Sequence, residues 1–162
     1  MLIEPAPFAT YTARLLIATL VGGLIGINRD LRHKPAGLRT HAIVALGAAL
    51  VTILSIEIAG HDGQSADVSR VLQGVITGIG FLGAGVILHR DDTQGVHGLT
   101  TAAAIWTVAV LGMAIGAGLW RESLLTTLLV LAVLQFGGPI ETTIRRWRER
   151  HGQPPIPPSE SP

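Results

Sequence analysis

Residues 99–120 read LTTAAAIWTVAVLGMAIGAGLW and contain no charged side chain. An α-helix rises about 1.5 Å per residue, so about 20 apolar residues cross the hydrocarbon core of a bilayer. The stretches at residues 71–88 and 123–140 are also without charge. These three stretches therefore predict three helices that span a membrane.

Two more stretches come close to the same length. Residues 8–27 are interrupted by Arg14, whose side chain we expect to extend along its aliphatic stem to the membrane surface. Residues 38–59 are apolar between a basic start and one acid near the end. The sequence thus predicts an all-α fold, a polytopic membrane helix bundle of about five transmembrane helices. We expect it to cover residues 1–145, and a disordered cytoplasmic tail, basic and then proline-rich, to cover residues 146–162.

The composition narrows the class of protein. Hydrophobic residues make up 48% of the chain and charged residues 14%, whereas soluble domains average about 25% charged residues. A net charge of +1 gives no field that would attract nucleic acid. There is no cysteine, and no hydrolase triad, phosphate-binding loop or zinc motif is visible. The sequence therefore predicts neither an enzyme nor a cofactor nor a metal site.

Lysine and arginine are distributed unevenly between the two sides of this bundle. The loops and tail on the C-terminal side hold nine of these residues and the other side holds three. Because basic loops stay in the cytoplasm, we expect the N-terminus outside and the C-terminus inside. No ionisable residue lies near the middle of the last three predicted helices. Pumps and proton relays usually need such residues, so this pattern counts against a transporter.

The segment after the first predicted helix reads NRDLRHKPAGLRTH at residues 28–41. Its last three residues, Arg39, Thr40 and His41, lie at the start of the second helix. A positive charge is unfavourable at a helix N-terminus, so we expect Arg39 to meet an anion. The candidates are Asp30 in the same segment, a lipid phosphate, or an acidic partner.

Two further polar pairs precede predicted helices. Asp67 and Arg70 are three residues apart, which favours an ion pair beside the helix N-terminus over a binding site. Thr100 and Thr101 begin the fourth helix, and one of them is expected to act as its N-cap.

Glycines recur at a spacing of four residues in several of the predicted helices. The pairs are Gly22 and Gly26 in the first, Gly74 and Gly78 in the third, and Gly112 and Gly116 in the fourth. Small residues at this spacing let helix backbones approach closely in lipid, which predicts tight helix packing. The alternative is a thin helix wall beside a cavity or a dimer seam. The third helix also carries Gly80, Gly83 and Gly85.

Three ordered motifs make the reading more specific. They are AGLRTH at residues 36–41, GIGFLGAGVI at residues 78–87 and GLTTAAAIW at residues 98–106. In this order and spacing the sequence resembles the MgtC/SapB family over roughly residues 15–135. The matching positions are Arg29, Arg39, Thr40, His41, Asp67, Arg70, Gly78, Gly80, Gly83, Gly85, Thr100 and Thr101. Together with Asp30, the polar members of this set are the candidate functional residues.

The resemblance implies a multi-pass protein of the bacterial cytoplasmic (inner) membrane, linked to magnesium homeostasis and growth at low magnesium. Many members add a C-terminal cytoplasmic domain, so the resemblance implies a short form with the transmembrane domain only. The expected function is a non-enzymatic modulator that binds another membrane complex, such as ATP synthase or a P-type ATPase. The alternatives are a transporter or channel for magnesium or another small solute, and a membrane scaffold subunit. Besides lipid, the expected partner is a membrane protein, and the small-residue faces also permit a homodimer.

Two positions depart from the family pattern. The family usually has an acid before Arg29, where this chain has Asn28, and a basic residue before the Gly-Leu-Thr-Thr motif, where this chain has His97. If these positions form a charged pair in the family, a hydrogen bond between two neutral side chains is expected here.

Overall fold

The computed structural model describes residues 7–62, 65–88 and 97–151, and these residues form five α-helices. The helices are α1 (Phe8–Leu31), α2 (Leu38–Asp62), α3 (Ser65–Leu88), α4 (Leu99–Gly116) and α5 (Trp120–Arg150). Each is long and apolar enough to cross a membrane. The predicted all-α membrane bundle is therefore confirmed.

The ends of the helices differ from the predicted ones in several places. Helix α1 continues past residue 27 to Leu31, and α3 begins at Ser65 rather than at residue 71. Helix α4 ends at Gly116, before the predicted end at residue 120, because Gly118 has a φ of +94° that no α-helix accommodates. These shifts matter mostly in α1, where the extension makes Arg29 part of the helix.

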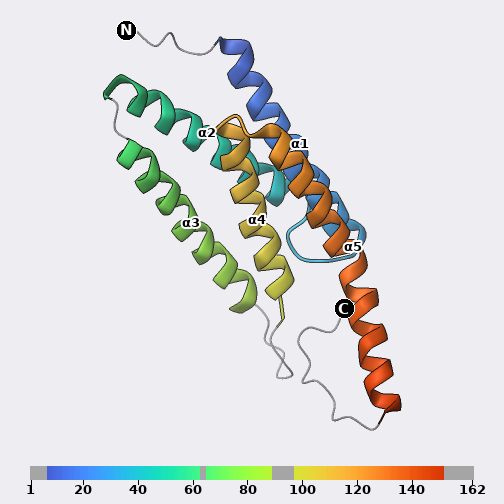
Figure 1. Cartoon of the computed structure of the whole chain (residues 1–162). Coiled ribbons are helices and arrows are strands. Elements are labelled where there is room, and N and C mark those ends of the chain that lie inside the picture. Colours follow the sequence, from blue (N-terminus) through green and yellow to red (C-terminus); the bar gives the residue numbers. More distant parts are fainter. Residues whose placement is uncertain (1–6, 63–64, 89–96, 152–162) are drawn as a thin grey trace.

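Helix α5 differs most from the sequence prediction. It contains Pro139 and continues to Arg150, well past the predicted end at residue 140. Residues 146–150 are therefore helical and do not belong to a disordered tail, whereas residues 152–162 lie outside the described part of the chain. The C-terminal half of α5 projects beyond the other helices (Figure 1). Its basic side chains thus stand at one end of the molecule.

Helices α2 and α4 form the centre of the bundle. Helix α2 packs against α1, α3 and α4, and α4 also contacts α1, α3 and α5. Helix α3 lies along one edge and α5 along the other (Figure 1), and among the described helices α3 contacts neither α1 nor α5. The α1–α2 connection, the start of α4 and the end of α3 meet at one end, which we call the basic end because the connection and the nearby end of α5 are rich in Lys and Arg.

The core lies where α1, α2 and α4 meet, and it is built from small and branched apolar side chains. Its buried members are Ala18, Val21, Ile25, Ala45, Ala49, Val108, Leu111 and Ile115. A Cβ on Gly112 would lie 2.9 Å from the Ala45 Cα, and one on Gly116 would lie 2.6 Å from the Ala49 carbonyl oxygen. Neither side chain could fit, so the two glycines let α2 and α4 pack backbone to backbone.

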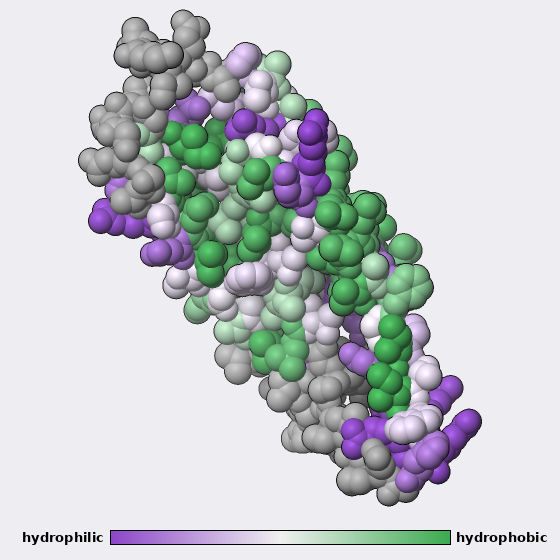
Figure 2. All heavy atoms as spheres, viewed as in Figure 1, coloured by the Kyte–Doolittle hydropathy of each residue, from purple (hydrophilic) through white to green (hydrophobic). Residues whose placement is uncertain are grey.

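The outer surface is apolar between the two ends of the molecule. Figure 2 shows hydrophobic residues over the middle of the bundle and hydrophilic residues gathered toward its ends. In the most apolar stretch of each helix, only 11% of the residues of α3 and of α5 are buried, against 56% of those of α4. In a bilayer, the outer faces of α3 and α5 are therefore open to lipid or to other membrane proteins.

Candidate functional site

A buried arginine from α1 reaches α4 at the basic end. Arg29 is only 3% exposed, and its Nη2 donates a hydrogen bond of 2.5 Å to Oγ1 of Thr101, which is 2% exposed. Removing a guanidinium from water costs several kcal/mol unless hydrogen bonds and charges compensate. A chain that keeps such a group inside a membrane bundle has a use for it, so Arg29 and Thr101 are the first members of the candidate site.

The second helix contributes a histidine that is fully enclosed. His41 has no exposed surface, and its Nδ1 lies 3.0 Å from the Gly37 carbonyl oxygen one turn earlier. Its Nε2 makes no hydrogen bond within the described residues. The charges of Arg29 and Asp30 both act on this ring. The site therefore joins α1, α2 and α4 through Arg29, His41 and Thr101.

The loop between α1 and α2 is held by Asp30. Its Oδ2 accepts a hydrogen bond of 2.9 Å from the backbone N–H of Leu38, the first residue of α2. This carboxylate satisfies an N–H that the helix leaves unpaired and complements the positive end of its dipole. A Cβ on Gly37 would overlap the same carboxylate. Asp30 is thus a cap for α2, and of the three anions considered for Arg39, Asp30 does not form an ion pair with it.

The remaining predicted site residues do not join the buried cluster. Arg39, Thr40 and Thr100 are exposed. The expected threonine N-cap of α4 is wrong, because Gly98, with a φ of +88°, takes that position without a side-chain cap. At the other end of the bundle, Asp67 and Arg70 form the predicted ion pair at 3.2 Å, with side chains 51% and 78% exposed. The candidate residues therefore form two separate groups.

The glycines also divide into two groups. Gly22 and Gly26 pack α1 against the start of α2, since added Cβ atoms would lie 2.7 Å from the Ala45 Cβ and 2.6 Å from the Leu38 Cα. Among the α3 glycines, Gly83 is the only one that meets another helix of the described chain, with the Ala102 Cβ at 3.5 Å from its added Cβ. Nothing within the described chain lies within 4 Å of the Cβ positions of Gly74, Gly78, Gly80 and Gly85. The packing predicted for these four glycines is not made inside this bundle.

Two polar links were missed by the sequence analysis. The side-chain oxygen of Gln135 on α5 accepts a hydrogen bond of 2.8 Å from Arg32 and one of 3.4 Å from the Asn28 side-chain nitrogen. Asn28 therefore faces α5, and its expected hydrogen bond to His97 is not formed. Arg14 donates a hydrogen bond of 2.8 Å to the Gly116 carbonyl oxygen at the end of α4. Both were detectable as polar residues inside apolar stretches.

The fold and the buried polar site define a polytopic helical membrane protein. The sequence model of the MgtC family matches residues 15–143. The chain is 46% identical over 129 residues to the protein SrpB of Synechococcus elongatus. The aligned region covers 75% of this chain and 71% of that protein. The chain belongs to the MgtC family, as its three motifs predicted.

Two other relatives carry names that bear on function. The "Putative magnesium transporter YhiD" of Escherichia coli is 41% identical over 131 residues, covering 78% of this chain and 60% of that protein. The "Protein MgtC" of Brucella abortus is 38% identical over 146 residues, covering 90% of this chain and 59% of that protein. The chain thus spans about three fifths of the length of these two relatives. No solved structure matches it.

Proposed function

We propose that this chain is a non-enzymatic regulator of magnesium homeostasis in the bacterial cytoplasmic membrane, with its basic end in the cytoplasm. It acts by lateral contact with another membrane complex, such as a P-type ATPase or ATP synthase. The observation that carries this proposal is the closed core between α1, α2 and α4. The magnesium-related names of two relatives support the physiological link.

The closed core argues against a path for ions through the described bundle. The backbones of Ala45 and Ala49 fill the spaces beside Gly112 and Gly116. The apolar core residues around them are at most 4% exposed, and the polar neighbour of Gly116, Thr52, is 1% exposed. Magnesium demands about six oxygen ligands and gives up its waters reluctantly. Among the described residues no group of three or more His, Asp or Glu side chains could hold a metal ion. A carrier would have to separate α2 from α4 to pass the ion.

A contact surface for a partner is available on α3. Four exposed residues follow one another at intervals of three or four positions and therefore share one face of α3: Gln73, Thr77, Gly80 and Ala84. Gln73 lies about 9 Å along the helix from Asp67, where the apolar span begins. Its amide has no hydrogen-bond partner within the described residues, and lipid tails offer none. A polar or small face of a neighbouring transmembrane helix satisfies this amide.

The first experiment separates regulation from transport. The purified full chain is placed in vesicles that contain a magnesium-sensitive dye, and magnesium entry is compared with that in protein-free vesicles. We expect equal entry with and without an inside-negative potential. Magnesium uptake that depends on the protein would overturn the regulator and support the transporter.

The second experiment tests the α3 face. The chain has no cysteine, so Thr77→Cys introduces a unique thiol, and Leu125→Cys on α5, which is 61% exposed, is the matched control. We expect a cross-link from position 77, but not from position 125, to a defined membrane protein in cells grown at low magnesium. In a deletion strain, Gln73→Leu with Gly80→Leu should fail to restore growth at low magnesium although it is inserted normally. Full restoration by this double variant would refute the contact.

A further inference from the structure

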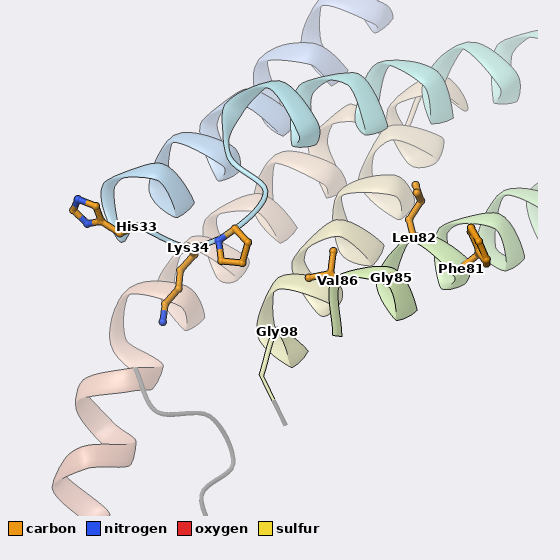
Figure 3. Close-up of a pocket in the computed structure, with 8 residues that line it drawn as sticks. His33, Lys34, Phe81, Leu82, Gly85, Val86 and Gly98 are labelled. Carbon is orange, nitrogen blue, oxygen red and sulfur yellow. The ribbon is translucent and has the colours of Figure 1, made fainter. Parts of the chain in front are cut away.

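A cavity of about 800 Å³ lies at the basic end, between the α1–α2 loop and the C-terminal part of α3. The loop contributes His33, Lys34 and Pro35, and Gly98 contributes from the start of α4. Helix α3 contributes Phe81, Leu82, Gly85 and Val86. Figure 3 shows the loop residues and the α3 residues on facing sides of this space. Its α3 residues belong to the motif at residues 78–87 and Gly98 opens the motif at residues 98–106, whereas Arg29 and His41 do not line it.

The α3 wall of the cavity is apolar and hollowed. Phe81 is 81% exposed and Leu82 is 50% exposed. Among the described residues, no atom beyond its own stretch of helix lies within 4 Å of the Gly85 Cβ position, so the absence of a side chain there leaves room along the helix. Large apolar side chains beside an empty glycine position form a surface suited to an alkyl chain.

The opposite wall carries a positive charge. Lys34 extends from the loop, while the His33 ring points away from α3 (Figure 3). No ion pair or hydrogen bond within the described residues holds the Lys34 ammonium. The nearby carboxylate of Asp30 is already used by the backbone N–H of Leu38. An anion that enters the cavity can therefore pair with Lys34.

The two walls lie at different depths of the membrane. Lys34 belongs to the loop outside the spanning helices, whereas the apolar span of α3 ends at Ile87. Phe81 lies six residues deeper, which is about 9 Å along the helix axis. A ligand that touches both walls needs an anionic head at the membrane surface and an alkyl chain in the hydrocarbon region.

We propose that this cavity binds one anionic phospholipid of the leaflet at the basic end. Its phosphate pairs with Lys34, and the first part of one acyl chain lies over Gly85 between Phe81 and Leu82. A volume of about 800 Å³ accommodates a headgroup and part of a chain, since small-molecule sites generally measure about 300–1,000 Å³. The proposal does not depend on the regulatory function, and it uses a different face of α3 from Gln73 and Gly80.

The test measures lipid retention by the full chain, purified in neutral detergent, with native mass spectrometry. Three probes are added separately: a phosphatidylglycerol, a phosphatidylcholine with the same acyl chains, and glycerol phosphate without chains. We expect one tightly bound phosphatidylglycerol, and at least tenfold weaker binding of the other two probes. Equal binding of phosphatidylcholine would remove the role of the anionic head. Binding of glycerol phosphate as tight as that of the lipid would assign the site to a soluble phosphate and overturn the lipid.

Two variants locate the site, each with a matched control. Lys34→Gln should weaken phosphatidylglycerol binding about fivefold, since a basic residue near a membrane surface contributes about 1 kcal/mol. Arg145→Gln, which removes another exposed basic residue near this end, should not. Gly85→Leu should weaken it at least tenfold by filling the cavity, whereas Gly80→Leu, equally open but on another side of α3, should not. Unchanged binding in Lys34→Gln, or equal losses in variants and controls, would refute the proposal even if Gly85→Leu failed to fold.

Discussion

Replacing Gly112 by alanine tests whether the close approach of α2 and α4 holds the bundle together. The added Cβ would lie 2.9 Å from the Ala45 Cα and would overlap the Ala45 carbonyl oxygen. Ordinary contact begins at 3.4 Å, so the helices must separate locally by at least 3.4 − 2.9 = 0.5 Å. A gap of about 0.5–1 Å removes roughly a quarter to a half of the dispersion energy of the contacts it opens.

The expected cost of this separation follows from the behaviour of overpacked cores. An extra methyl group that forces backbone shifts destabilises a protein by about 1–3 kcal/mol. Gly47→Ala is the matched control, because Gly47 lies in α2 and no other helix of the described chain comes within 4 Å of its Cβ position. That change should be neutral, or stabilise α2 by up to about 1 kcal/mol through the higher helix propensity of alanine.

The assay is unfolding of the purified chain in mixed micelles, titrated with sodium dodecyl sulfate and followed by circular dichroism. Gly112→Ala should unfold at a lower detergent fraction than the parent, and Gly47→Ala at the same or a higher fraction. If the two variants unfolded together, the α2–α4 backbone contact would contribute nothing to stability. A core held closed to ions by this contact would then be refuted.

Two more predictions use the same titration. Thr101→Val removes the acceptor of the buried Arg29 hydrogen bond and should lower the free energy of unfolding by about 1.5–3 kcal/mol. The control Thr107→Val, at a half-buried position of the same helix, should lower it by less than about 1 kcal/mol. Equal losses in the two variants would contradict the role of Thr101. Asp30→Ala removes the cap of α2 and should lower the free energy of unfolding by about 1 kcal/mol. The control Glu141→Ala, at an exposed position of α5, should change it by no more than about 0.5 kcal/mol. An unchanged free energy in Asp30→Ala would show that the loop holds its conformation without the carboxylate.

The sequence was sufficient to predict the five helices, because long uncharged stretches are decided by the bilayer and not by their neighbours. It was not sufficient to say which glycines pack inside the chain. Gly22 and Gly26 have the same spacing as Gly74 and Gly78, yet only the first pair contacts another helix of the described bundle. The pattern marks a small face, but the topology decides whether a helix of the same chain covers it.

The candidate site was only partly predictable, and the reason is the register of two helices. Arg29 follows Gly22, Ile25 and Gly26 at helical spacing, so it lies on the buried face once α1 extends to Leu31. Ending the helix at residue 27 hid this relation.

Periodicity also separates the neighbouring residues of the second motif. His41 precedes Ala45, Ala49 and Thr52 on the buried face of α2, whereas Arg39 and Thr40 fall outside it. The pairings of Arg29 with Thr101 and of Arg32 with Gln135 depend on how the helices cross. No spacing within one segment could indicate which residues pair.

The polar links divide the bundle into a fixed part and a lightly attached part. Arg14 joins α1 to Gly116 at one end of α4, and Arg29 joins α1 to Thr101 at the other. Arg14 and Arg29 are 15 residues apart in α1, and Thr101 and Gly116 are 15 residues apart in α4. Helix α1 is therefore bonded to α4 at two points about 22 Å apart along antiparallel helices.

Helix α3 is held differently. The side-chain hydrogen bonds described for it, from Arg70 and Thr77, both stay within α3, and its packing on α2 and α4 is by apolar side chains such as Leu72, Val75 and Ile79. Apolar contacts are non-directional and give no fixed register, whereas the links of α1 do. A partner helix or a lipid that binds α3 can therefore shift it without breaking a hydrogen bond of the core. Both of the proposed binding surfaces include residues of this helix.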